Sequence, residues 1–176
     1  MVNYKSIKLS PGLYFVSTPI GSARDITLRA LDILASADVL AAEDTRTLKK
    51  LLEIHGIQLK NRSLISYHDH NGSKARPKLL AYLENGKSVA YASEAGTPLI
   101  ADPGFSPLND VLSMENDVTS APGPCALIAA LTVAGLPTDR FYFEGFLPNN
   151  KSQREIKFRG LKSYRGTLIF YESAKR

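Results

Sequence analysis

The chain has 176 residues, of which 44% are hydrophobic, so it can bury one sizeable core, or one domain and part of a second. Its N-terminal segment has no apolar region typical of a signal peptide, and no apolar run approaches the ~18 residues that a membrane helix needs. The single cysteine, Cys125, excludes a disulfide framework and a cysteine-based metal cluster. We therefore expect a soluble, cytoplasmic protein with no metal and no membrane partner.

Strand and helix patterns alternate along residues 13–134. Short apolar runs rich in β-favouring residues are each followed by a segment with apolar residues at helical spacing. Asp25 is the expected N-cap of the first helix, and Gly56 and Gly135 are expected to stop two later ones. The predicted strands are residues 13–17, 39–42, 64–66, 88–92 and 118–121, and the predicted helices are residues 26–34, 43–55, 74–84, 105–114 and 125–134.

This order of elements predicts an α/β fold with a Rossmann-like, doubly wound sheet of five parallel strands and helices on both faces. From residue 137 the pattern changes to a strand at 141–144, a basic helix at 151–161 and a strand at 167–171. These three elements cannot close a core of their own, so we expect the start of a second domain that is cut short or completed elsewhere. The expected division is an N-terminal α/β domain in residues 10–122, followed in residues 123–176 by a linker helix and the truncated start of a C-terminal domain.

Three loops rich in glycine and proline follow predicted strands, at residues 18–21, 93–104 and 122–126. The carboxyl ends of the strands are where ligands bind in open α/β sheets. Small residues expose main-chain groups and prolines limit flexibility, so these loops suit a ligand held by the main chain. Surface connections rich in turn formers are the alternative interpretation.

None of these loops matches a dinucleotide fingerprint or a phosphate loop, which argues against NAD and NTP binding. The helix that begins after Pro124 is expected to offer free N–H groups and a positive dipole end to a carboxylate.

Several side chains carry groups that could take part in catalysis or bind a metal ion. The His-Asp-His sequence at residues 68–70 places two histidines on one face of a strand, but a third ligand at a recognisable spacing is missing, which favours a polar strand end over a metal site. Asp44 and Arg46 at a helix start indicate an N-cap or an ion pair. Cys125 beside a helix N-terminus is either a nucleophile or a small packing residue.

The positive charge is concentrated at the end of the chain. The formal net charge is +5, and residues 149–176 carry 8 Lys and Arg against 2 Glu, whereas residues 1–148 are nearly balanced. A basic segment of this kind is typical of a polyanion-binding surface, and a solvated helix face is the alternative.

A set of short motifs resembles one known family. In chain order these motifs are LYFVSTPIG, DITLRAL, AAEDTR, SYHDHN, AGTPLIADPG, APGPCALIAAL, GLPTDRF, FEGFLP and FYES. Together they resemble the ribosomal small-subunit RNA 2′-O-ribose methyltransferases of the tetrapyrrole-methylase superfamily, from about residue 11 to residue 176. The resemblance implies an α/β N-terminal domain, a mixed-sheet C-terminal domain, a homodimer, and S-adenosylmethionine bound in the cleft between the domains.

The resemblance also implies which residues bind the cofactor. The sequence departs from the family pattern at Glu94, where aspartate is usual, at Cys125, where serine is usual, and at Ser22-Ala23, where Asn-Leu is usual. Family members also continue for roughly another hundred residues by the same resemblance. The implied cofactor-binding residues are Thr18, Pro19, Ile20, Gly21, Ser93, Glu94, Ala95, Gly96, Thr97, Pro98, Pro122, Gly123, Pro124, Cys125 and Ala126.

The implied reaction is methyl transfer to the ribose 2′-hydroxyl of a cytidine in 16S rRNA of the small ribosomal subunit. A small-molecule methylase of the tetrapyrrole type and a catalytically incompetent binding fragment are the alternatives. Candidate proton acceptors are Glu43, Asp44, His68, Asp69 and Glu172, among which the sequence does not choose. The candidate RNA-binding residues are Lys151, Arg154, Lys157, Arg159 and Lys162.

Overall fold

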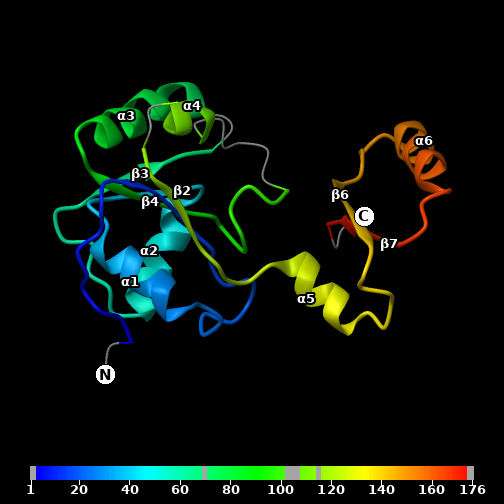
Figure 1. The fold of residues 1–176 in the computed structure, drawn as a ribbon, viewed down its shortest axis with the longest axis horizontal. Helices are drawn as coiled ribbons and strands as arrows, with labels where there is room; N and C mark the ends of the chain where they lie inside the picture. Colours follow the sequence, from blue (N-terminus) through cyan, green and yellow to red (C-terminus); the bar gives the residue numbers. More distant parts are fainter. Residues whose placement is uncertain (1–2, 69–70, 102–107, 114–115, 174–176) are drawn as a thin grey trace. The chain divides into compact units, whose positions relative to one another are not determined.

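The computed structural model describes residues 3–68, 71–101, 108–113 and 116–173 (Figure 1). The chain divides into two compact units, Met1–Cys125 and Ala126–Arg176. Among the described residues, no helix combines the length and the apolar character needed to cross a lipid bilayer.

The first unit is built on a five-stranded sheet in which every pair of neighbouring strands is parallel. The strand order is β3-β2-β4-β1-β5, so β1 lies between β4 and β5. This arrangement confirms the predicted parallel α/β fold. The strands are β1 (Gly12–Val16), β2 (Val39–Ala42), β3 (Ser63–Ser66), β4 (Ser88–Ala92) and β5 (Val118–Ala121).

Helices cover both faces of this sheet (Figure 1). Successive side chains of a strand point to opposite faces. In β4, Ala90 and Ala92 pack with α1 and α2, whereas Val89 and Tyr91 pack with α3 and α4. The strands are therefore apolar on both faces, which explains their continuous apolar runs. The helices are α1 (Leu28–Ser36), α2 (Thr45–Ile54), α3 (Gly72–Glu84) and α4 (Leu108–Ser113).

The start of α1 differs from the prediction. The N-cap is Thr27, whose hydroxyl accepts a hydrogen bond from the Ala30 N–H at 3.2 Å. Asp25 instead belongs to the preceding turn, in which its N–H donates to the Ser22 carbonyl at 3.0 Å. The prediction that Asp25 caps the helix is wrong because this turn holds Asp25 before the first helical residue.

The second unit begins with α5 (Ala126–Val133) and continues with β6 (Phe141–Phe146), α6 (Lys151–Leu161) and β7 (Thr167–Tyr171). β6 and β7 pair in parallel, and their register shifts between Phe143 and Gly145. Glu144 is therefore an extra residue in a β-bulge, a feature that redirects a side chain. Phe158 of α6 meets Phe170 of β7 with ring centroids 5.6 Å apart, so α6 packs on this pair of strands.

Candidate functional site

The loops that follow β4, β1 and β5 begin at the same edge of the sheet, because these three strands are parallel neighbours. They are residues 93–101, 17–21 and 122–125 in the described part of the chain. The end of the second predicted loop, residues 102–104, lies outside the described residues. The three loops thus share the carboxyl edge at which ligands bind in α/β folds.

The loops after β1 and β4 are joined by main-chain and hydroxyl contacts. Thr18 and Gly96 form an antiparallel bridge, with N···O distances of 2.9 Å and 3.0 Å. The Thr18 hydroxyl donates to the Ser93 carbonyl at 3.1 Å, and the Ser93 hydroxyl donates to the Gly96 carbonyl. Thr18 and Ser93 are both buried, and these bonds satisfy their hydroxyls.

The loop after β5 lies close against the end of β1. A Cβ added at Gly123 would lie 2.8 Å from the Ser17 Cβ, so this approach requires glycine. The Pro124 carbonyl accepts from the Thr97 hydroxyl at 2.9 Å, and the Pro122 carbonyl accepts from the Thr27 hydroxyl at 3.4 Å. Hydroxyls from the start of α1 and from the loop after β4 therefore hold a loop that contains two residues without an N–H group.

The main chain after β4 has unusual conformations. Gly96 has a φ of 89°, and the non-glycine residues Leu99 and Ala101 have φ of 69° and 59°. Left-handed conformations of such residues carry strain and occur preferentially at functional sites. Contacts with the rest of the first unit therefore hold the main chain of this loop in conformations that its residues would not favour on their own.

These loops fit a ligand that binds main-chain groups. A Cβ added at Gly21 would meet no atom within 4 Å, so space is open beside that residue. Glu94 and Ala95 are exposed on the neighbouring loop, while the main chain beneath them is fixed by the Thr18–Gly96 bridge. An open surface over a fixed main chain suits a ligand that is held by main-chain groups at the carboxyl edge of the sheet.

Residues at the start of α5 differ from one expectation. Cys125 is a half-buried free thiol, and Ala126 is the first residue of α5. The Leu127 N–H donates to the Tyr171 hydroxyl at 3.0 Å. The expectation that this helix start leaves its N–H groups free is therefore wrong for Leu127, because a tyrosine from β7 occupies that donor.

Asp44 has a structural role. It is the N-cap of α2, and its carboxylate accepts from the Arg46 N–H at 2.7 Å and from the Arg46 guanidinium at 2.9 Å. The hydrogen bonds from the Arg46 side chain, followed by that from its N–H, hold the pKa of Asp44 below its usual value. A carboxylate with a lowered pKa is a weaker proton acceptor. Asp44 also raises the pKa of Arg46, with a smaller effect from Glu94.

The other candidate proton acceptors lie at several places. Glu43 is half-buried directly after β2, and His68 is half-buried shortly after β3. The Asn71 carboxamide accepts from the His68 N–H at 2.9 Å. Glu172 is exposed in the second unit, and Asp69 lies outside the described residues. Among the residues that the structure describes, no group of three His, Cys, Asp or Glu side chains could hold a metal ion.

The basic residues of α6 fall into two groups. Lys157 contacts Glu144 of β6 with an N···O distance of 2.6 Å, and Glu144 raises the pKa of Lys157. The Arg154 guanidinium donates to the Pro148 carbonyl at 3.0 Å. Lys151, Arg159 and Lys162 are exposed. The first two side chains thus contact residues outside α6, whereas Lys151 and Arg159 contact Glu155 within the helix, at 4.0 Å and 3.4 Å. The exposed three form the outward basic surface of this segment.

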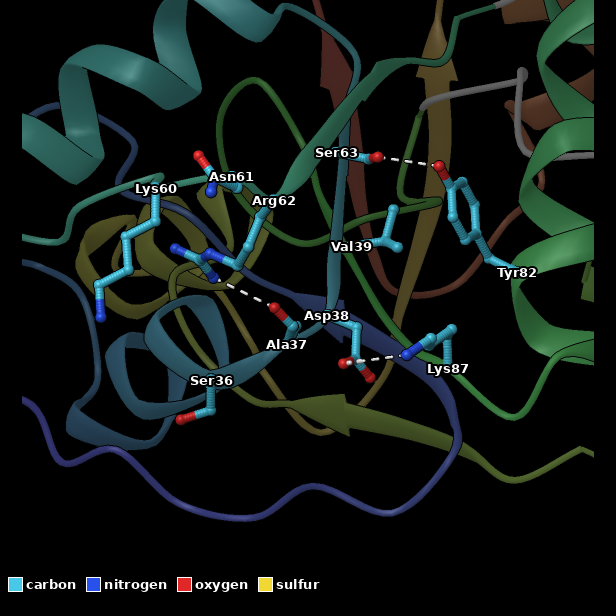
Figure 2. A pocket seen from close by; sticks show the side chains of 10 residues that line it. All are labelled: Ser36, Ala37, Asp38, Val39, Lys60, Asn61, Arg62, Ser63, Tyr82 and Lys87. Atoms are coloured by element: carbon cyan, nitrogen blue, oxygen red, sulfur yellow. Dashed lines mark hydrogen bonds and ion pairs between the residues drawn. The ribbon is translucent and has the colours of Figure 1, made fainter.

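A cavity of about 500 Å³ lies at the opposite, amino edge of the sheet (Figure 2). Arg62 lines this cavity, and its guanidinium donates to the Leu34 carbonyl at 2.7 Å and to the Ala37 carbonyl at 3.2 Å. Lys87 lies 3.9 Å from Asp38 on the other side. Basic side chains at helix C-termini balance the helix dipole and the unpaired carbonyls, so the charge of this cavity is structural.

Two residues of the carboxyl edge were absent from the sequence-based set. Ser17 and Thr27 contribute hydroxyls to the loop contacts. A threonine directly before an apolar helical run is an N-cap signal, so Thr27 could have been found from sequence. Ser17 carries no comparable signal, because its contact with Thr97 joins residues that are 80 positions apart.

Comparisons with known proteins agree with this fold. The family model described as Tetrapyrrole (Corrin/Porphyrin) Methylases matches residues 12–176. A protein of Mesorhizobium japonicum named ribosomal RNA small subunit methyltransferase I is 49% identical over 168 residues, which cover 96% of this chain and 56% of the relative. The Escherichia coli O157:H7 protein of the same name is 46% identical over 177 residues, covering 100% of this chain and 61% of the relative.

Solved structures agree at the level of the fold. A crystal structure of diphthine synthase superposes with a TM-score of 0.68 and 17% identity, covering 92% of this chain and 65% of the other. The chain spans a little over half the length of the curated relatives described above.

Proposed function

We propose that this chain, which belongs to the tetrapyrrole (corrin/porphyrin) methylase family, carries the methyl-donor site of an S-adenosylmethionine-dependent enzyme that methylates small-subunit ribosomal RNA. The observation that carries the proposal is the tied set of three loops at the carboxyl edge of the sheet, in a chain nearly half identical to proteins named for that activity. The finer proposal is 2′-O-methylation of a cytidine ribose in 16S rRNA, in the cytoplasm and by a homodimer.

The residues of the carboxyl edge would act by binding and orientation. Bound there, S-adenosylmethionine supplies a methyl group on a positively charged sulfur. The chain has to hold the acceptor hydroxyl in line with that methyl group and exclude water, so positioning provides most of the catalysis. The bridge between Thr18 and Gly96 would keep the main chain of two loops in one binding geometry.

A proton acceptor would assist the weakly acidic 2′-hydroxyl. Glu43 and His68 follow the neighbouring strands β2 and β3 at the same edge. Asp44 is the less suitable candidate, because Arg46 holds its pKa low. We therefore favour Glu43 and His68 over Asp44 for this role.

Titration calorimetry with S-adenosylmethionine tests the cofactor site. Gly21→Trp should fold, because open space surrounds that position, and should lose binding, because the new side chain fills that space. Gly160→Trp is the matched control, since no atom lies within 4 Å of its added Cβ in α6 either, and it should bind as the wild type does. Absence of heat with the wild-type chain would refute the cofactor assignment.

Methyl transfer to unmodified small ribosomal subunits tests the substrate. Tritium from the methyl donor is expected on a ribose, and label on a base would contradict 2′-O-methylation. Nucleoside analysis of the labelled RNA would also show whether the modified residue is a cytidine.

The salt dependence of RNA binding tests the outward basic surface of α6. Neutralising Lys151, Arg159 and Lys162 to glutamine should reduce the slope of log K against log salt by up to ~0.7 per lost phosphate contact. Glutamine at the exposed Lys49, Lys50 and Lys78 of the first unit gives a control of equal charge change. Equal slopes for the two triple variants would mean that the α6 residues form an ordinary solvated face.

A further inference from the structure

Thr97 connects two loops that do not belong to neighbouring strands. It lies after β4, and its hydroxyl accepts from the Ser17 hydroxyl at 3.4 Å and donates to the Pro124 carbonyl at 2.9 Å. β1 lies between β4 and β5 in the sheet. Thr97 therefore reaches across the end of β1 to the loop that follows β5.

The hydroxyl of Thr97 has one proton, and that proton is directed to Pro124. A threonine hydroxyl can donate a single hydrogen bond, and its remaining lone pairs can only accept. The hydroxyl is thus engaged on both sides by the protein. Its effect on a ligand would pass through the main chain that it holds, and no donor is left for direct contact.

The loop after β5 depends on its carbonyl groups for attachment. Pro122 and Pro124 have no N–H to donate, and the contact from Thr27 to the Pro122 carbonyl is the longer one, at 3.4 Å. Gly123 between them packs directly on Ser17. The bond from Thr97 is therefore the shorter of the two described hydroxyl contacts that fix this main chain.

We propose that Thr97 is a positioning residue for the methyl donor. It holds residues 122–124 against the end of β1 in the geometry that binds S-adenosylmethionine, and it does so without contacting that ligand. The inference rests on the proposed cofactor site and adds to it a residue that acts through Pro124.

Calorimetry with S-adenosylhomocysteine separates this role from general stability. Thr97→Val keeps the side-chain shape and removes the hydroxyl, so the dissociation constant should rise about fivefold to tenfold, the effect of one lost neutral hydrogen bond. Thr97→Ser keeps the hydroxyl and should bind within about twofold of the wild type. Thr132→Val is the matched control, because the Thr132 hydroxyl donates to the Ile128 carbonyl at 2.8 Å within α5, and its affinity should not change.

A second ligand separates positioning from direct contact. 5′-Methylthioadenosine lacks the amino-acid portion, and the proposal predicts the same fold loss in Thr97→Val for both ligands. A loss confined to S-adenosylhomocysteine would limit the effect of Thr97 to the amino-acid portion and overturn the proposal that Thr97 sets the geometry of the whole site. Unchanged affinity in a folded Thr97→Val protein would overturn it as well.

A different result would show that the proposed cofactor site is itself wrong. If the wild-type chain binds neither ligand, the proposed function fails together with this inference. If valine prevents folding, Thr97→Ala compared with Thr97→Ser gives the same test, with circular dichroism reporting the fold.

Discussion

Single residues at the carboxyl edge set how closely the loops approach one another. Gly123 is the clearest case, because its missing side chain allows the loop after β5 to lie directly on Ser17. Gly96 serves the neighbouring loop in another way, since its φ of 89° is a conformation that other residues adopt with strain. Small residues therefore have a geometric role here that their chemistry alone would not suggest.

Gly123→Ala tests this role by adding one methyl group. The new Cβ would lie 2.8 Å from the Ser17 Cβ, so the loop has to move, and we expect the free energy of unfolding to fall by about 1–3 kcal/mol. Gly160→Ala, within α6 and with open space around it, should instead stabilise the protein by up to ~1 kcal/mol. Chemical denaturation of both variants measures the difference, and equal effects would contradict the close contact.

Asp38 makes stability depend on pH. Its carboxylate accepts from the Ser88 N–H at 2.9 Å and from the Ser88 hydroxyl at 2.8 Å. The bond from the Ser88 N–H is the largest effect that lowers the pKa of Asp38, against an opposing effect of burial. Since the folded pKa lies below the unfolded value of about 3.9, the stabilisation is present above that pH and is lost as the pH falls through the folded pKa.

Asp38→Asn should remove this pH dependence. We expect a loss of about 1 kcal/mol at neutral pH, from weakened hydrogen bonds to Ser88, and a smaller further loss on acidification than in the wild type. Denaturation curves between about pH 5 and pH 2 measure the acid limb. If the free energy of unfolding of Asp38→Asn fell as steeply with decreasing pH as that of the wild type, other carboxylates would be responsible for the pH dependence.

At the scale of elements, Arg62 joins the end of α1 to the segment that leads into β3. Its guanidinium occupies all its nitrogen atoms with main-chain carbonyls, and burial lowers its pKa. Such a planar fork matches several acceptors at once. The carbonyls belong to Leu34, Ala37, Gln58 and Leu59.

Arg62→Met and Arg62→Lys should therefore be similarly harmful. Each leaves several partly buried carbonyls without donors, and we expect a loss of about 2–4 kcal/mol, because a lysine ammonium cannot span the same acceptors. Arg29→Lys is an exposed change on α1, and its free energy of unfolding should stay within about 0.5 kcal/mol of that of the wild type. Thermal unfolding measures both changes, and an effect of Arg62→Lys as mild as that of the control would contradict the proposed role of the Arg62 hydrogen bonds.

The elements themselves could be predicted from the sequence because their signals are local. Apolar spacing placed β2, β4, α6 and β7 at the bounds that the structure shows. The start of α1 was misplaced because both Asp25 and Thr27 are acceptable caps, and the turn at Ser22 decides between them. Local preference gives the kind of element, whereas neighbouring turns fix its first residue.

The candidate site likewise has some features that the sequence predicts and others that it does not. Glycine and proline content indicated the three loops, and parallel strands placed them at one edge. The contacts that fix these loops join residues far apart in sequence, such as Thr18 with Ser93 and Thr97 with Pro124. The pair of Glu144 and Lys157 was equally hidden, since it depends on the bulge in β6. Periodicity carries no information about such long-range pairs.

At the scale of the whole molecule, the first unit separates its two edges by role. The carboxyl edge carries the tied loops, with strained residues and open space beside Gly21. The amino edge carries helix C-termini. There the Arg62 guanidinium donates to the Leu34 carbonyl, and Lys87 lies beside the Asp38 carboxylate (Figure 2). The second unit accounts for the net positive charge, since residues 126–176 carry 9 Lys and Arg against 4 Asp and Glu.

The amino edge also offers a place to engineer a more robust protein. Lys60 lines the cavity there with a φ of 51°, a conformation that glycine adopts without strain. Lys60→Gly should raise the free energy of unfolding by up to about 1 kcal/mol, whereas Lys50→Gly inside α2 should lower it by about as much. Because the change lies at the edge opposite the loops, affinity for the methyl donor should be unaltered, which would make the variant a better starting point for crystallisation.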